Sequence, residues 1–375
     1  MNDTVRQQND FCGITAWHEA GWTGKGVKVW NLETDSGHGH TTRMRILDAA
    51  PDAEVTSASH FLAYSKGEIT EEHIIEDGKN LSADQFVNEH GFHILSASLS
   101  GKAKSSVEAR RTLYGNLRKK YNLTLFNSAG NDGSDGVQGG HFPESEAIYV
   151  GACMAFKKNH NDLRMWQYSS IGDEEDEVDF STFPADQSGT SFSCPYLAGT
   201  TALLMQRYGT MTSAEVYQYY KMIARPIPTG HPYKDGYDLW SGYGVPILPD
   251  PKRKLVRMTI GSKFYKVDGE TRTMDTAPSI YQQRTFVPIA FVALALGCAV
   301  RWNAQEQEVT ISNNGRIVSM WIGRKTYLVN GKPYEMDAMP FIQNQRTQVP
   351  IAFVSLALGC KVAWIETERK VMVLG

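Results

Sequence analysis

The chain lacks the features of several common protein classes. None of its 375 residues forms an apolar run of the roughly 18 residues that a membrane span needs, and residues 1–10, MNDTVRQQND, are polar where a signal peptide would be apolar. The five cysteines are odd in number and include no CxxC pair, which favours free thiols over a disulfide framework. A net charge of -3 gives no argument for nucleic-acid binding. The localisation stays open, with the cytoplasm favoured over conventional export.

What the chain does contain is typical of a globular protein of about two domains, with 41% hydrophobic and 21% charged residues. In residues 1–248, short apolar strands alternate with segments of helical period. This alternation predicts an α/β domain with a mostly parallel sheet and helices on both faces. Pro246, Pro249 and Pro251 interrupt regular structure, so we place a second domain at residues 249–375.

Residues 187–196, QSGTSFSCPY, place a serine on a tight turn before the apolar run LAGTTALLMQRYG. Gly189 permits the turn, and the fixed φ of Pro195 suits the first turn of a helix. Backbone N–H groups at a helix start can hold the oxyanion that forms when a serine attacks a carbonyl. Ser191 is therefore a candidate nucleophile, while an ordinary helix cap is the alternative for this serine alone.

The partners of a nucleophilic serine come earlier in the chain. Residues 24–35, GKGVKVWNLETD, predict a buried strand that ends in acidic residues, and His38 follows at once. Acid, histidine and serine in this order form one of the known triad orders. Further blocks follow in the chain, SASLSG, FNSAGNDG, PESEAIYVGA and SGYGV, and together all the blocks span roughly the first two-thirds of the chain. This part of the chain resembles the subtilisin-like serine proteases.

The resemblance implies a role for each matching residue. His38 matches the general base, and Asn131 matches the asparagine whose amide helps to form the oxyanion hole. The segment whose backbone pairs with an extended polypeptide substrate is matched by Ser98, Leu99, Ser100 and Gly101. His38-Gly39-His40-Thr41 departs from the family's His-Gly-Thr-His block.

The acid departs from the family pattern. Counted from Gly26, the position of the family's aspartate falls on Glu33, whereas Asp35 lies in an Asp-Ser-Gly that copies the family's motif. We favour Glu33 and keep Asp35 as its rival. The insert that the family carries between acid and base is nearly absent, so we predict no structural calcium, and His38 with His40 is a weak zinc signal. We therefore expect no cofactor.

The C-terminal residues contain a duplication. FVPIAFVALALGC at 286–298 returns at 348–360, and IGSKFYKVDG at 260–269 returns at 322–331, so both offsets are 62 residues. Each copy, about 253–314 and 315–375, predicts a hairpin, a strand ending in Val-Pro, a helix and a final strand, so the domain is α+β. It resembles the stalk domain named after the amino terminus of copper amine oxidases. Copper is not implied, because the repeats contain no histidine.

The resemblances predict a serine endopeptidase that hydrolyses peptide bonds through an acyl-enzyme, with polypeptide as its substrate. The stalk repeats imply a protein or surface partner, or self-association. The alternative is a catalytically weak or inactive subtilase-fold binding module anchored by the repeats, which the departure at the acid position motivates.

Overall fold

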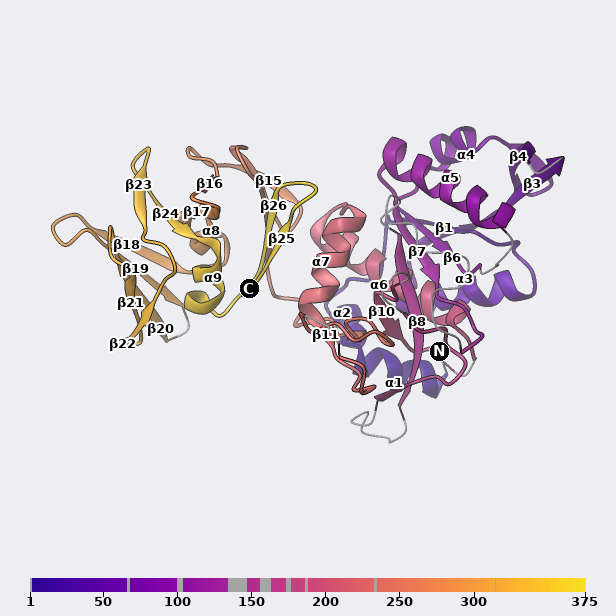
Figure 1. Cartoon of the computed structure of the whole chain (residues 1–375), viewed down its shortest axis with the longest axis horizontal. Coiled ribbons are helices and arrows are strands. Elements are labelled where there is room, and N and C mark those ends of the chain that lie inside the picture. Colours follow the sequence, from indigo (N-terminus) through magenta and orange to yellow (C-terminus); the bar gives the residue numbers. More distant parts are fainter. Residues whose placement is uncertain are drawn as a thin grey trace. The chain divides into compact units, whose positions relative to one another are not determined.

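The computed structural model describes residues 2–65, 68–99, 104–133, 147–155, 163–172, 177–185, 188–232, 235–313 and 315–375. The chain divides into two compact units, Met1–Pro251 and Lys252–Gly375, which are coloured indigo to red-orange and orange to yellow in Figure 1. Among the described residues, every helix is too short or too polar to cross a membrane.

A mixed sheet forms the centre of the N-terminal unit (Figure 1). In the described residues it has seven strands, of which six follow the order β10-β8-β7-β6-β1-β2, and every neighbouring pair in this order is parallel. The six are β1 (Lys28–Asn31), β2 (Glu54–Ser57), β6 (Ile94–Ala97), β7 (Thr124–Ser128), β8 (Ile148–Ala155) and β10 (Phe180–Thr182). The seventh, β9 (Leu163–Met165), pairs antiparallel with β8. This architecture confirms the predicted α/β fold.

Helices cover both faces of the sheet because successive strand side chains point to opposite sides. On one face, Trp30, Leu95 and Leu125 form a buried cluster with Phe86 of α4 (Ala83–His90) and Leu113 of α5 (Lys104–Tyr121). On the other face, the Ser96 hydroxyl of β6 lies 3.9 Å from Cys194 Sγ of α6 (Thr190–Tyr208). The sheet therefore has the two covered faces that a parallel sheet requires.

Helix α6 is the buried centre of the unit and packs closely against α3 (His38–Ala49). Gly199 permits this approach, because a Cβ atom there would lie 2.3 Å from the carbonyl oxygen of Ile46. The remaining helices are α1 (Asp3–Phe11), α2 (Ile14–Glu19) and α7 (Ser213–Ile223). Sequence analysis did not identify α3, although Thr42, Arg45, Ile46 and Ala49 recur at helical spacing on its buried side.

Two small sheets complete the described part of the N-terminal unit. Strands β3 (Ser59–Ser65), β4 (Glu68–Glu76) and β5 (Lys79–Leu81) form an antiparallel sheet that the sequence analysis did not predict. Strands β11 (Ala224–Arg225) and β12 (Val245–Pro246) pair near the end of the unit.

The C-terminal unit contains both repeats. The first supplies β13 (Leu255–Thr259), β14 (Phe264–Val267), β15 (Glu270–Thr273), β16 (Ser279–Tyr281), β17 (Arg284–Pro288), α8 (Ile289–Ala295), β18 (Ala299–Asn303) and β19 (Glu308–Asn313). The second supplies β20 (Arg316–Trp321), β21 (Thr326–Val329), β22 (Lys332–Glu335), β23 (Phe341–Gln343), β24 (Arg346–Pro350), α9 (Ile351–Leu358), β25 (Lys361–Ile365) and β26 (Lys370–Leu374). Each repeat has the predicted hairpin, strand, helix and strand.

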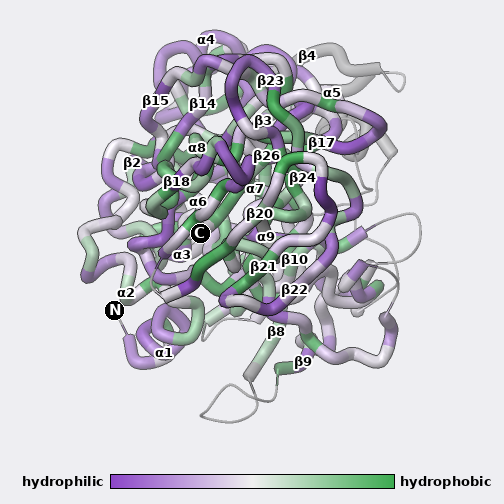
Figure 2. Tube along the Cα trace, turned by 90° about the vertical axis from the view of Figure 1, so that its left-hand side faces the viewer, coloured by the Kyte–Doolittle hydropathy of each residue, from purple (hydrophilic) through white to green (hydrophobic). Residues whose placement is uncertain are grey.

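The repeats exchange strands. One five-stranded sheet has the order β15-β14-β13-β26-β25 and the other β18-β19-β20-β21-β22, so each combines three strands of one repeat with two of the other. The last four residues of β26, hydrophobic in Figure 2, are buried against the first repeat. A third sheet, β16-β17-β24-β23, joins the repeats at its centre. The two repeats therefore share one core.

Two features of the duplication are repeated in detail. The predicted turns Asp268-Gly269 and Asn330-Gly331 have positive φ at both positions, with values of 51° and 87° in the first and 48° and 79° in the second, as a type I′ hairpin turn requires. Ion pairs also cross between the repeats at equivalent places, Arg284 with Asp337 and Arg346 with Asp275. In each pair, the arginine begins β17 or β24 of one repeat, and the aspartate follows β22 or β15 of the other repeat.

Candidate active site

Ser191 lies in the first turn of α6. Gly189, directly before the helix, has φ 131° and ψ 150°, a conformation open to glycine and hardly any other residue. Pro195 lies further into the helix than the sequence suggested, because α6 already begins at Thr190. A proline at this position has no N–H to give to the Ser191 carbonyl, and the Ser98 hydroxyl donates to that oxygen instead, at 2.8 Å. The hydrogen bond from Ser98 replaces the helix bond that Pro195 cannot form, and it connects the first turn of α6 to the end of β6.

His38 is the first residue of α3. Gly39 follows it with no room for a side chain, since a Cβ atom there would lie 1.7 Å from the carbonyl oxygen of Thr34. The loop that carries the acidic residues therefore folds directly onto the helix start. This close approach explains why a glycine follows the histidine.

Glu33, and not Asp35, is the carboxylate that contacts His38. Glu33 Oε1 lies 3.1 Å from His38 Nδ1, and the Glu33 side chain is 15% exposed against 46% for His38. A carboxylate only accepts, so Nδ1 carries the proton and Nε2 keeps its lone pair in the neutral ring. The hydrogen bond that His38 donates to Glu33, together with the negative charge of Glu33, raises the pKa of His38 against the opposing effect of partial burial. Asp35 instead accepts from the Ser57 hydroxyl at 3.5 Å.

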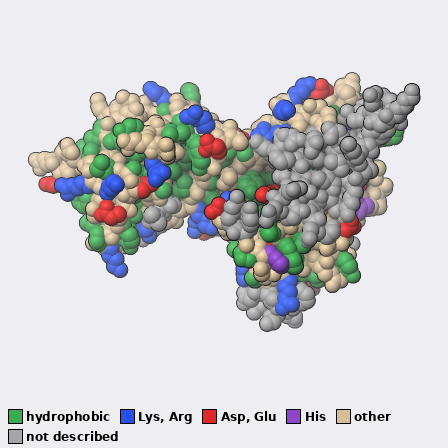
Figure 3. Space-filling view, in the orientation of Figure 1, with side chains coloured by type: hydrophobic (Ala, Val, Ile, Leu, Met, Phe, Trp, Pro, Cys, Tyr) green, Lys and Arg blue, Asp and Glu red, His purple; other side chains and the backbone are tan. Residues whose placement is uncertain are grey.

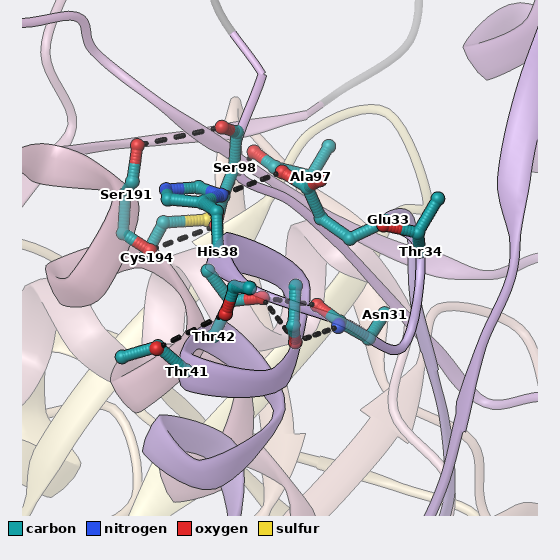
Figure 4. Close-up of polar contacts among 12 residues, drawn as sticks. Asn31, Glu33, Thr34, His38, Thr41, Thr42, Ala97, Ser98, Ser191 and Cys194 are labelled. Atoms are coloured by element: carbon teal, nitrogen blue, oxygen red, sulfur yellow. Dashed lines mark hydrogen bonds and ion pairs between the residues drawn. The ribbon is translucent and has the colours of Figure 1, made fainter.

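The histidine ring lies between the acid and the serine in Figure 4, with its second nitrogen on the side of Ser191. Phe192, the residue after Ser191, contacts the His38 ring with 5.4 Å between ring centroids. The Ser191 hydroxyl donates a long bond of 3.4 Å to the Ser98 carbonyl oxygen. The arrangement has the order acid, imidazole, hydroxyl that a general-base mechanism uses.

The side-chain amide of Asn131 has a fixed orientation. Its Oδ1 accepts from the Thr190 backbone N–H at 2.8 Å and from the Thr190 hydroxyl at 3.0 Å. The Gly130 N–H in turn donates to that hydroxyl at 3.0 Å. Because a backbone N–H can only donate, the atom facing Thr190 must be the oxygen, and the Asn131 NH₂ group points away from it. Asn131 is exposed, so its N–H donors are available to a ligand at the start of α6.

The predicted substrate segment is described only in part. Ser98 lies at the site through its two contacts with Ser191. The Leu99 carbonyl accepts from Asn127 Nδ2 at 3.4 Å, and the Leu99 side chain packs against the buried cluster around Trp30. Ser100 and Gly101 lie outside the described residues.

Two buried residues that position the site, Asn31 and Arg45, were not predicted from the sequence. Asn31 Nδ2 donates to the Gly39 carbonyl at 3.0 Å, which holds the start of α3 against β1. Arg45 of α3, which is 2% exposed, donates through Nε to the Phe192 carbonyl at 3.3 Å. A polar residue inside an apolar strand and an arginine on the apolar side of a helix were the available signals.

His40 and Cys194 carry groups that could support metal or thiol chemistry. Among the described residues, no group of three His, Cys, Asp or Glu side chains could hold a metal ion, and His40 is exposed. Cys194 is fully buried, and its burial raises the pKa of the thiol to about 12, so the thiol stays protonated at neutral pH.

Comparisons with known proteins match each part of the chain to a family. Residues 31–244 match the sequence profile of the subtilase family, and residues 250–309 and 266–373 match that of the copper amine oxidase N-terminal domain. Subtilisin DY of Bacillus licheniformis is 24% identical over 149 residues, which make up 36% of this chain and 51% of the relative. The chain thus spans about half the length of the curated relative that it matches.

Two crystal structures are also similar to the chain. A lanthipeptide protease has 17% identity and a TM-score of 0.40, over 66% of this chain and 94% of that one. MycP1 from the ESX-1 type VII secretion system has 16% identity and a TM-score of 0.43, over 65% and 87%. The subtilase match covers more than half of the 375 residues and confirms the family that the sequence motifs indicated. The chain belongs to the subtilase family.

Proposed function

We propose that this chain is a serine endopeptidase that hydrolyses peptide bonds through an acyl-enzyme. The observation that carries the proposal is the contact between Glu33 and His38 Nδ1 at 3.1 Å, beside a serine at the start of a buried helix. This contact leaves Nε2 as the basic nitrogen on the serine side. Family membership supports the same reaction class.

In the first half of the reaction, His38 Nε2 takes the proton of the Ser191 hydroxyl as Oγ attacks the scissile carbonyl carbon. The carbonyl π electrons move to oxygen, and Asn131 Nδ2–H with the Ser191 backbone N–H holds this oxyanion. As the oxyanion collapses, the C–N bond breaks and His38 gives its proton to the leaving amine. An ester on Ser191 remains.

In the second half, His38 takes a proton from a water molecule as the water oxygen attacks the ester carbonyl carbon. The bond from this carbon to Ser191 Oγ then breaks, His38 returns its proton to Oγ, and the acid product is released. Glu33 stabilises the imidazolium in both halves, in agreement with its raising effect on the pKa of His38. All acid, base and oxyanion functions come from these side chains and the backbone, so the proposal includes no metal or organic cofactor.

The proposed substrate is an extended polypeptide. Residues 98–101 follow β6, whose carboxyl end lies beside Ser191, and a substrate strand would pair with this backbone. Main-chain pairing tolerates many sequences, so the side-chain pocket would supply the selectivity.

The test is labelling of the purified chain with a fluorophosphonate, followed by peptide mapping. We expect an adduct on Ser191 in the wild type, none in Ser191→Ala, slow labelling in Glu33→Ala and near-normal labelling in Asp35→Ala. No adduct in folded wild type would contradict the proposal and favour the inactive binding module. An adduct without peptide hydrolysis would retain the nucleophile and exclude the endopeptidase.

A further inference from the structure

The two repeats differ chemically at an equivalent tryptophan. Trp302 and Trp364 are 62 positions apart, on β18 and β25. In the second repeat, the Trp364 indole N–H donates to the Glu366 carboxylate. In the first repeat, the position equivalent to Glu366 is Ala304, and the Trp302 side chain is 48% exposed. The first repeat thus keeps the indole donor and lacks the carboxylate that accepts from it.

Trp302 lies in a groove of about 360 Å³ within the C-terminal unit. The groove runs between the start of α8, strand β18 and the β23–β24 hairpin, and its apolar lining includes Ile289, Val309 and Ile342. Ile342 is 47% exposed, so its side chain is accessible to a ligand in the groove. Figure 3 shows hydrophobic side chains gathered on the visible face of this unit.

The charges that line the groove have one sign. Arg301 and Arg346 line it, and no acidic residue does so among the residues that the structure describes. Asp275 neutralises Arg346 through an ion pair. Arg301 has no ion pair within the described ranges, and its equivalent in the second repeat is Ala363. The first repeat therefore carries a cation that the second lacks, Arg301, three positions before the acid that the second repeat carries and the first lacks.

The groove borders the edge of a sheet. Strand β18 is the outer strand of the order β18-β19-β20-β21-β22, so one side of its backbone has no strand neighbour in the described part of the unit. An extended chain can pair with such an edge while its alternate side chains enter a neighbouring pocket. An edge strand beside an apolar groove favours a peptide as occupant.

We propose that this groove binds an extended polypeptide segment that carries an apolar side chain next to an acidic one. The apolar side chain lies against Trp302 and Ile342. The carboxylate accepts from the Trp302 indole N–H, as the Glu366 carboxylate does from Trp364, and is attracted by Arg301. The backbone pairs with β18. This binding site is independent of Ser191 and of its chemistry.

The test uses the full chain carrying Ser191→Ala, immobilised, so that no peptide is cleaved. Two synthetic hexapeptide pools, blocked at both ends, differ only in a central Phe-Glu or Phe-Gln, and a third pool offers Phe-Gln with a free C-terminal carboxylate. Retained peptides are quantified by mass spectrometry. We expect the Phe-Glu pool to be retained several-fold above both others.

Matched variants locate the binding. Trp302→Ala and Ala304→Glu should each lower retention of the Phe-Glu pool by about ten-fold or more, the first by removing the contact surface and the second by supplying the chain's own carboxylate. Trp364→Ala, the same change in the other repeat, should leave retention unchanged. Because Trp302 and Ala304 are both exposed, their variants should keep the wild-type circular dichroism spectrum.

Three results would overturn the proposal. They are equal retention of the Phe-Glu and Phe-Gln pools, undiminished retention by Trp302→Ala, and an equal loss in Trp364→Ala. Preference for the free C-terminal carboxylate would also reject the acidic side chain as the group bound. None of these outcomes bears on the labelling of Ser191 in the wild type, which is a separate experiment. This proposal and the protease proposal can therefore fail separately.

Discussion

Replacing Glu33 by Gln should nearly abolish peptide hydrolysis without unfolding the chain. The side chain keeps its length, but its NH₂ group can turn toward His38 Nδ1 and favour the tautomer with the proton on Nε2, which cannot accept the serine proton. Loss of the corresponding carboxylate in a serine protease triad costs about 10⁴-fold in kcat, or about 5 kcal/mol at 1.36 kcal/mol for each factor of ten. The 15% exposure of Glu33 means that little solvent screens this interaction.

The pH dependence gives a second readout of the same change. Glu33 raises the pKa of His38, so the wild type should gain activity as the pH rises through this raised value and the imidazole loses its proton. In Glu33→Gln the pKa falls back, and the acidic limb of the kcat/KM profile should move to lower pH. Steady-state hydrolysis of a chromogenic peptide between pH 5 and 9 measures both effects.

Asp35→Asn and Glu33→Asp are the controls for this prediction. Asp35 contacts Ser57 and not His38, so its change should alter kcat by less than about two-fold, as for a surface substitution outside the machinery. Glu33→Asp shortens the side chain by one carbon–carbon bond, about 1.5 Å, and should lose much of the activity. A larger loss in Asp35→Asn than in Glu33→Gln, or an acidic limb that stays in place in Glu33→Gln, would refute the reasoning.

Four further predictions follow from other parts of the chain. Asn131→Ala should lower kcat about 100- to 1000-fold with little change in KM, because one oxyanion donor is removed; equal kcat would place the oxyanion elsewhere. Burial raises the pKa of Asp179 to about 8, so the folded state binds the extra proton and stability should fall between about pH 4 and 8 by up to about 1.4 kcal/mol per pH unit. Thermal melts of Asp179→Asn should lack this part of the slope, and an unchanged slope would assign it to another group. Deleting residues 315–375 removes β26 and β20, one of the two strand partners of β13 and of β19, and leaves the shared core open, so the amide protons of residues 255–313 should lose their protection from exchange; retained protection would show that one repeat folds alone. Chelation with EDTA should leave peptide hydrolysis unchanged, and a loss restored by calcium would reveal a required metal.

The local pattern predicted the parallel strands β1, β2, β6, β7 and β8, because their apolar runs are short, buried and separated by turn residues, but it did not predict the three-residue strand β10. A count from Gly26 in the register of the family that the chain resembles selected Glu33, and the structure brings that residue to His38. The count works because a strand rises by a constant amount per residue, so its carboxyl end fixes where the next side chains lie.

Long-range contacts were beyond the same reasoning. Arg45 reaches the Phe192 carbonyl across 147 positions of the chain, and the contact exists only because α3 packs on α6. The local sequence pattern does not predict the strand exchange between the repeats either. A period of 62 residues shows that two copies exist, but the edge of a strand does not specify which copy supplies its partner.

Helix packing positions two of the three groups of the proposed triad. His38 begins α3 and Ser191 lies in the first turn of α6, and the contacts at Gly199 and Arg45 fix these helices against each other. The acid alone depends on the short loop between β1 and α3. A glutamate there extends one carbon–carbon bond further than an aspartate, so the loop can be short and its carboxylate still reaches Nδ1. The departure from the family pattern thus falls at the one member of the proposed triad whose position a loop determines.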